Sequence, residues 1–193
     1  MSNMNDILCE NGIQIFDNYL NAQEMDILSE ILNKKMYNFN HNSGNREKIV
    51  TEFFSFYNKD DFFTNYLKHK IELSVKKKLN IVRHYMHIQT FGQDGGYHID
   101  DTGSNKYTFC LYINDVYSSL SDDTTIQYVN LDETSGEFLI KIPMQNYILS
   151  IDTLNNRGIF FHSQFIHKGM AYNRFIDKPR LCITWKFEEI YIS

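Results

Sequence analysis

The chain has 193 residues, of which 42% are hydrophobic and 15% aromatic, so it is long and apolar enough to fold around a substantial core. Its formal net charge of −5 and the lack of a basic patch argue against a nucleic-acid-binding protein. No apolar run approaches the ~20 residues of a membrane span, and the opening residues, MSNMNDILCE, lack the basic and apolar regions of a secretory signal peptide.

The three cysteines, Cys9, Cys110 and Cys182, are an odd set without paired spacing. This pattern predicts reduced thiols and a cytoplasmic location. Cys110 and Cys182 fall within runs that resemble strands, where packing is their simplest role.

The N-terminal part, about residues 12–80, is predicted to be a mainly helical support. Residues 12–20 indicate a short strand followed by a turn. Asn21 and Glu24 then have the spacing of a capping box, in which each side chain bonds the backbone N–H of the other residue. Apolar residues at helical spacing follow, so we expect an amphipathic helix over 22–35.

Residues 40–48 are expected to form a polar loop in which His41 is solvated, and residues 49–57 have the composition of a strand. Asp60 and Asp61 open a second predicted helix. Its apolar face is formed by Phe63, Leu67, Ile71, Val75 and Leu79.

From residue 81 to about 187 the pattern becomes β. Strands are predicted over 81–89, 107–114, 136–143, 145–151, 158–162 and 180–187. A long polar and acidic excursion, 118–135, interrupts them. Two helices followed by about eight short strands predict a mainly β protein with N-terminal helices packed on a β sandwich or jelly roll, as one domain over 1–193.

The segment Gly95-Gly96-Tyr97-His98-Ile99-Asp100 places an imidazole and a carboxylate two positions apart, after a glycine turn. Two such groups can bind one metal ion from adjacent directions. An H-x-D pair is common by chance and leaves a metal underligated, so the rest of the chain must supply a third ligand and a pocket.

The last predicted strand has two distinct faces. One face carries an apolar stripe, and the other carries Arg180, Cys182, Thr184 and Lys186. An arginine that points into a cavity needs an anionic partner, and a carboxylate bound by two hydrogen bonds is the natural one. From this strand alone, an exposed arginine at a strand end is the alternative.

Three segments together resemble the 2-oxoglutarate- and Fe(II)-dependent oxygenases, in particular their prolyl-4-hydroxylase-like branch. They are GGYHIDD followed by YTFCLYIN, then SGEFLIKIP, then GIFFHSQFIHKGMAYNRFIDKPRLCITWKF. The resemblance covers residues 81–187, the whole predicted β core. It implies a double-stranded β-helix, the jelly roll that is also called cupin-like.

The resemblance also implies roles for single residues. His98, Asp100 and His167 correspond to the iron ligands, and Arg180 corresponds to the residue that pairs with the distal carboxylate of 2-oxoglutarate. Tyr112 corresponds to a tyrosine that shares this carboxylate.

Four further positions have weaker assignments. Thr184 is expected to hydrogen-bond near the cosubstrate or an iron-bound water. Tyr85 and Gln89 could line the pocket or simply pack within their strand, and Asn114 fits a structural turn.

The sequence departs from the family pattern at two positions. Ser135-Gly136 replaces a pair of glycines, and His162, a rival to His167 as the second imidazole, stands where related chains often have proline. Asp100 is retained, which argues against a halogenase because that enzyme needs the ligand position for halide.

The resemblance implies a dioxygenase that hydroxylates an unactivated C–H bond of a peptide side chain or a small metabolite and releases succinate and CO2. Its cofactors would be Fe(II), 2-oxoglutarate and O2, with ascorbate as a further candidate. We expect no nucleic-acid substrate, and loops 118–135 and 168–179 are candidates for a lid. The alternative is a metal-binding jelly roll without turnover.

Overall fold

The computed structural model describes residues 8, 12–33, 38–41, 52–57, 59–114, 135–143 and 147–191. Its helical elements are α2 (Ala22–Asn33), the π-helical segment η1 (Phe62–Leu67) and α3 (Lys68–Val75). Its strands are β1 (Ile13–Phe16), β2 (Asn38–His41), β3 (Phe53–Phe56), β4 (Leu79–Gln89), β5 (Lys106–Tyr112), β6 (Phe138–Lys141), β7 (Ile148–Ile151), β8 (Arg157–His162), β9 (His167–Gly169) and β10 (Arg180–Glu189). The prediction of a mainly β protein with N-terminal helices is confirmed.

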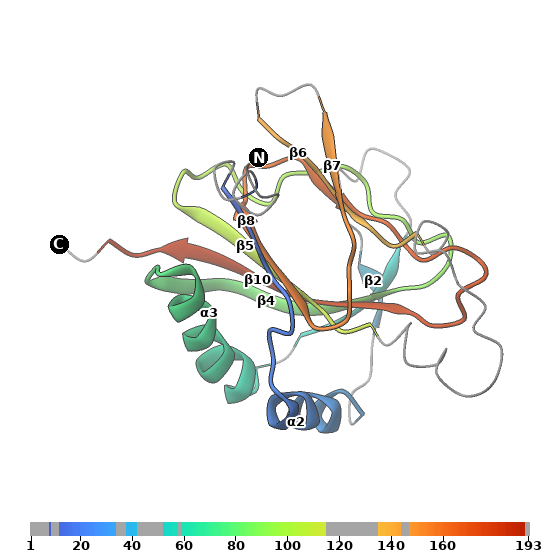
Figure 1. Cartoon of the computed structure of the whole chain (residues 1–193), viewed down its shortest axis with the longest axis horizontal. Coiled ribbons are helices and arrows are strands. Elements are labelled where there is room, and N and C mark those ends of the chain that lie inside the picture. Colours follow the sequence, from blue (N-terminus) through green and yellow to red (C-terminus); the bar gives the residue numbers. More distant parts are fainter. Residues whose placement is uncertain are drawn as a thin grey trace, which may run out of the picture.

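The strands form two antiparallel sheets. The major sheet has the order β1-β8-β5-β10-β4-β3-β2, and the minor sheet has the order β7-β6-β9. Figure 1 shows α2 and α3 on one side of the major sheet, with β6 and β7 of the minor sheet on its other side. None of the helices in the described part of the chain is long and apolar enough to cross a bilayer.

The helices bury their apolar faces against the outer face of the major sheet. Leu28 of α2 and Ile71 of α3 are fully buried in the same cluster as Trp185 and Ile183 of β10. The predicted capping box at the start of α2 is also present. The N–H of Asn21 donates to Glu24 Oε2 at 2.7 Å, and the N–H of Glu24 donates to Asn21 Oδ1 at 3.0 Å.

Two local predictions are wrong. Leu79 does not extend the second helix, because Lys76 adopts a left-handed conformation (φ 56°) that ends α3, and Leu79 begins β4 instead. His41 does not lie in a loop, because it pairs with Phe53 at the end of β2. The excursion over 118–134 and Cys9 lie outside the described residues.

Strand β10 organises the site because it lies between β4 and β5 in the major sheet. Its odd-numbered residues Leu181, Ile183 and Trp185 face the helices. Its even-numbered residues therefore face the minor sheet, and Arg180, Cys182, Thr184 and Lys186 all line one cavity there. The alternation predicted from the sequence is confirmed.

The pairing of β10 with β4 contains one irregularity. Lys186 pairs with Arg83, but the next residue, Phe187, pairs with Ile81, so Val82 is an extra residue in β4. Such a bulge bends the strand and increases its twist. It lies at the end of the cavity-lining part of β10.

Candidate metal centre

The two histidines of the proposed triad are held side by side by backbone hydrogen bonds. The N–H of His98 donates to the carbonyl of His167 at 3.0 Å, and the N–H of His167 donates back at 2.9 Å. The N–H of Asp100 donates to the carbonyl of Ser163 at 2.9 Å. The loop that follows the glycine turn is thus attached to the start of β9, and residues 69 positions apart along the chain become neighbours.

Both imidazole rings have the same orientation relative to the backbone. Nδ1 of His98 lies 2.9 Å from the carbonyl of Gly96, and Nδ1 of His167 lies 2.8 Å from the carbonyl of Phe165. Because a carbonyl only accepts, Nδ1 carries the proton in each ring. In the neutral ring Nε2 is then a lone-pair donor for a metal ion, and the backbone bond fixes the direction in which it points.

The lone pairs of the triad converge. Nε2 of His98 is 3.3 Å from Asp100 Oδ1, Nε2 of His167 is 3.4 Å from Asp100 Oδ2, and the three ligand atoms lie within 4.8 Å of one another. Adjacent ligands of a metal ion at ~2.1 Å are about 3 Å apart, which is close to this spacing. Lone pairs on nitrogen that face a carboxylate repel it, and a cation between them removes this repulsion.

The surroundings keep these groups in the states that bind metal. Burial lowers the pKa of His167 to about 4, although Asp100 opposes this shift, so the ring is neutral at pH 7. Burial raises the pKa of Asp100, but Lys186 and the two imidazoles outweigh it and hold this pKa well below its usual range. His167 and Asp100 therefore present a neutral and an anionic ligand, and with Nε2 of His98 they form the set of two histidines and one carboxylate that suits Fe(II) with open coordination positions.

Arg180 lies deeper in the same cavity and is only 1% exposed. Its Nε donates to the carbonyl of Gly136 at 2.9 Å, and its Nη1 donates to Gln89 Oε1 at 2.6 Å. The guanidinium also lies over the ring of Tyr112, 4.7 Å from the ring centroid. All these partners are neutral, and no carboxylate in the described part of the chain forms an ion pair with Arg180.

The walls around Arg180 leave little freedom for its head group. A Cβ on Gly169 would lie 3.0 Å from both Nη1 and Nη2, so this glycine is needed for the close approach of β9. Gln89, predicted only as a possible pocket residue, holds the guanidinium and also donates to the carbonyl of Gln93 at 2.6 Å. Gln89 can reach the guanidinium because it pairs with Arg180 across β4 and β10.

The remaining predicted residues also lie near the cavity. Tyr112, Thr184 and Tyr85 line it, and Thr184 Oγ1 is 3.5 Å from the Cys182 thiol. Asn114 has the structural role that was predicted. Its Nδ2 donates to the carbonyl of Thr153 at 3.0 Å, and its Oδ1 accepts from the N–H of Leu181 at 2.8 Å.

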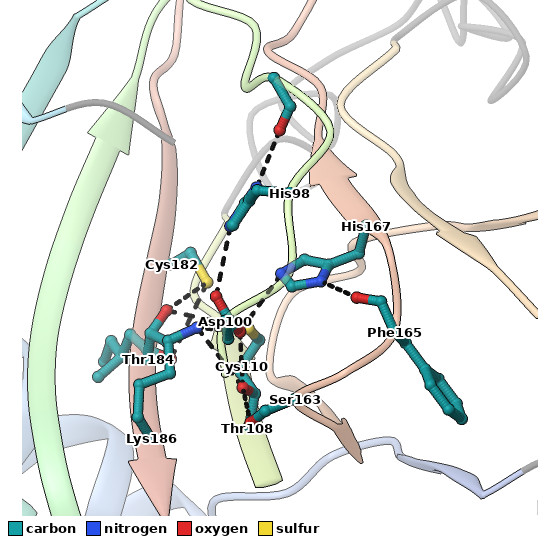
Figure 2. A network of polar contacts seen from close by, with 12 residues as sticks. His98, Asp100, Thr108, Cys110, Ser163, Phe165, His167, Cys182, Thr184 and Lys186 are labelled. Atoms are coloured by element: carbon teal, nitrogen blue, oxygen red, sulfur yellow. Dashed lines mark hydrogen bonds and ion pairs between the residues drawn. The ribbon is translucent and has the colours of Figure 1, made fainter. Parts of the chain in front are cut away.

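His162 is not part of the triad. Its ring packs on Tyr107, with 4.5 Å between ring centroids, and burial lowers its pKa. The residue that sequence reasoning missed is Lys186, whose ammonium contacts Asp100 Oδ2 (Figure 2). The signal was available, because alternation places Lys186 on the same face of β10 as Arg180.

Comparisons with known proteins agree with this geometry. Neither a protein-family model nor a curated protein matches the chain. Solved structures do match. A prolyl hydroxylase from Trichoplax adhaerens, solved with a hypoxia-inducible-factor peptide, has a TM-score of 0.68 at 17% identity and covers 95% of this chain and 86% of that one.

Two bacterial proteins are also similar in structure to this chain at low sequence identity. A prolyl-4-hydroxylase from Pseudomonas putida has a TM-score of 0.65 at 12% identity, covering 96% of this chain and 97% of that one. An oxidoreductase of the 2OG-Fe(II) oxygenase family from Burkholderia pseudomallei has a TM-score of 0.70 at 10% identity, covering 95% and 88%. The chain has the fold of the 2-oxoglutarate- and Fe(II)-dependent oxygenases.

Within this oxygenase fold, the departure at Ser135-Gly136 has a structural counterpart. Both residues have positive φ, 58° for Ser135 and 90° for Gly136. A Cβ on Gly136 would lie 2.4 Å from the ring of Tyr172, so the second glycine of the pattern is required and the first is not. The carbonyl of Gly136 is the acceptor for Arg180 Nε, which links this turn to the cavity.

Proposed function

We propose that the protein is an Fe(II)- and 2-oxoglutarate-dependent dioxygenase, built as a single double-stranded β-helix domain. One observation carries this proposal. The two histidines of the metal-ligating triad and a buried guanidinium line the same cavity, and among the described residues no carboxylate forms an ion pair with that guanidinium. A metal alone would account for the triad, but it would not account for a buried cation whose partners in the described part of the chain are all neutral.

His98, Asp100 and His167 would hold Fe(II) through two Nε2 atoms and one carboxylate oxygen. Arg180 would bind the distal carboxylate of 2-oxoglutarate, and the keto acid would reach from there to the metal. Burial raises the pKa of Tyr112, so its hydroxyl stays protonated and can donate to the same anion. Thr184 would complete the polar lining of the cavity between the metal and Arg180.

When bound, Fe(II) with 2-oxoglutarate and O2 would supply the oxidation of a C–H bond, with succinate and CO2 as products. The chain itself orients the metal ligands and the cosubstrate anchor, and it excludes water from the cavity. The backbone bonds at Nδ1 fix both imidazole planes, Gln89 and Gly136 fix the guanidinium, and Phe138 closes the cavity beside His167. Ascorbate would serve only to restore Fe(II).

The proposed substrate is a peptide side chain or a small metabolite, and the proposed outcome is hydroxylation. The fold also occurs in an epimerase and a carbocyclase of nogalamycin biosynthesis, so fold alone does not define the outcome. A metal-binding module without turnover is the alternative. Arg180 argues against it, because a scaffold gains nothing from a buried guanidinium that pairs with no anion among the residues that the structure describes.

The test uses the full chain without oxygen, then with it. Adding Fe(II) and 2-oxoglutarate anaerobically should produce a visible metal-to-ligand absorption band, and admitting O2 should yield succinate. His98→Ala should abolish both signals. His162→Ala is the matched control, because it removes a nearby imidazole outside the triad and should leave the band intact. A band that persists in His98→Ala would refute the proposal.

A further inference from the structure

Lys186 is a charged group in the metal cavity that neither the triad nor the cosubstrate anchor requires. It follows Thr184 on the inner face of β10, and its side chain is 16% exposed. Its Nζ contacts Asp100 Oδ2 and lies 3.5 Å from Thr108 Oγ1 (Figure 2). A buried ammonium is costly unless it is paired, so this contact is a specific feature of the site.

The two oxygens of Asp100 have different surroundings. Thr108 Oγ1 donates to Oδ2 at 2.6 Å, and Lys186 donates to the same atom. Because the hydroxyl proton of Thr108 is used there, the Ser163 hydroxyl, 3.0 Å away, must be the donor in its bond with Thr108. Both oxygens lie beside a triad nitrogen, Oδ1 at 3.3 Å from His98 Nε2 and Oδ2 at 3.4 Å from His167 Nε2. Each carboxylate oxygen has two lone-pair sites, so the two donors fill those of Oδ2 but not those of Oδ1.

The number of open positions at the metal depends on this asymmetry. An octahedral ion has six positions. With two imidazoles and one carboxylate oxygen, three remain, which is enough for a bidentate keto acid and for O2. If Asp100 bound through both oxygens, only two would remain and the keto acid would fill them.

We propose that Lys186 and Thr108 are positioning residues that restrict Asp100 to coordination through Oδ1 alone. The inference rests on the proposed function for its consequence, but the carboxylate geometry can be measured with the metal alone. Lys186 also keeps a positive charge beside the metal. This charge repels a divalent cation and attracts an anionic cosubstrate, so its removal should change the two affinities in opposite directions.

The experiment measures two dissociation constants for the full chain, that of Mn²⁺ alone and that of 2-oxoglutarate for the Mn²⁺-loaded protein. In Lys186→Met we expect Mn²⁺ to bind about tenfold more tightly and 2-oxoglutarate about tenfold more weakly. Lys186→Arg retains the charge and the hydrogen-bond donors, so both dissociation constants should be close to those of the wild type. Lys141→Met is the matched control, because it removes a lysine that lies over Tyr97, outside this cavity.

Infrared difference spectra on adding Mn²⁺ report the carboxylate directly. The wild type should show a carboxylate bound through one oxygen, and Lys186→Met should show a chelating one. Thr108→Val, which removes the other donor without a change of charge, should move the spectrum the same way while Mn²⁺ affinity rises less.

Equal Mn²⁺ affinity and an unchanged infrared spectrum in Lys186→Met would overturn the inference, since Lys186 would then be only a counterion of the metal-free carboxylate. Absence of 2-oxoglutarate binding in the wild type would instead refute the proposed function. The Mn²⁺ and infrared measurements would still decide the role of Lys186.

Discussion

Replacing Arg180 by methionine should separate stability from function. Methionine retains much of the apolar stem but removes a buried cation whose partners, among the described residues of the free protein, are neutral. Replacing buried charged groups by apolar ones is often neutral or stabilising by about 1–4 kcal/mol. Against this, the acceptors at Gly136 and Gln89 lose their donor, at about 1–3 kcal/mol each. The free energy of unfolding should therefore stay within about 2 kcal/mol of wild type.

The effect on the cosubstrate should be much larger. Loss of one partner of a buried charged hydrogen-bonded pair costs about 2–5 kcal/mol. A central value of about 3 kcal/mol raises the Kd of 2-oxoglutarate about a hundredfold. Urea unfolding of the free protein and calorimetric titration of the Mn²⁺-loaded protein with 2-oxoglutarate measure the two quantities. Arg83→Met, at an exposed arginine stacked on Tyr85, is the control for loss of charge.

One combination of results would refute this reasoning. If Arg180→Met unfolded far more easily than wild type but bound 2-oxoglutarate with unchanged affinity, the guanidinium would be a structural group and not an anion anchor. Wild-type affinity in Arg83→Met is required for the interpretation, because a general loss of positive charge would weaken the binding of any anion.

Three further predictions follow from described contacts. Gly169→Ala should raise the Kd of 2-oxoglutarate by about three- to tenfold with little effect on Mn²⁺ binding, because a Cβ 3.0 Å from both terminal nitrogens displaces a guanidinium that Gln89 holds in place. Asn21→Ala should lower the free energy of unfolding in urea by about 1 kcal/mol through loss of the α2 cap, and an unchanged midpoint would contradict the capping interpretation. Burial lowers the pKa of His84 from its ordinary value of 6.5 to about 4 in the folded protein. Between these two pH values the imidazole is protonated in the unfolded chain but not in the folded one. The stability that depends on His84 should thus be complete above pH 6.5 and fall by up to about 3 kcal/mol as the pH drops toward 4. In pH-resolved urea melts, His84→Phe should remove this part of the dependence and leave the similar part that comes from His167.

The site was predictable to the extent that local periodicity determines side-chain direction. The alternation of β10 placed Arg180 and Thr184 on one face, and the structure confirms that both line the cavity. The long-range pairing of His98 with His167 could not be read from spacing. It depends on a two-stranded contact between a loop and β9, and the family resemblance supplied it in advance.

The failures have identifiable physical causes. Leu79 continues the helical period of the residues before it, but Lys76 ends the helix in a left-handed conformation that a pattern of apolar residues does not encode. The alternation of β10 places Lys186 on the correct face but does not predict a role for it. A lysine near a strand end is usually solvated, and only its distance to Asp100 shows otherwise.

The bulge at Val82 makes it possible to change the bend of the sheet without changing the residues that line the cavity. Regular pairing of antiparallel strands would match Phe187 with Val82, whereas the extra residue matches it with Ile81. Deleting Val82 would leave the same partners opposite one another and would preserve the face on which each side chain lies. The shortened strand would lose only its curvature, so such a deletion could show how much the shape of the cavity owes to the bend of the sheet and how much to the residues that line it.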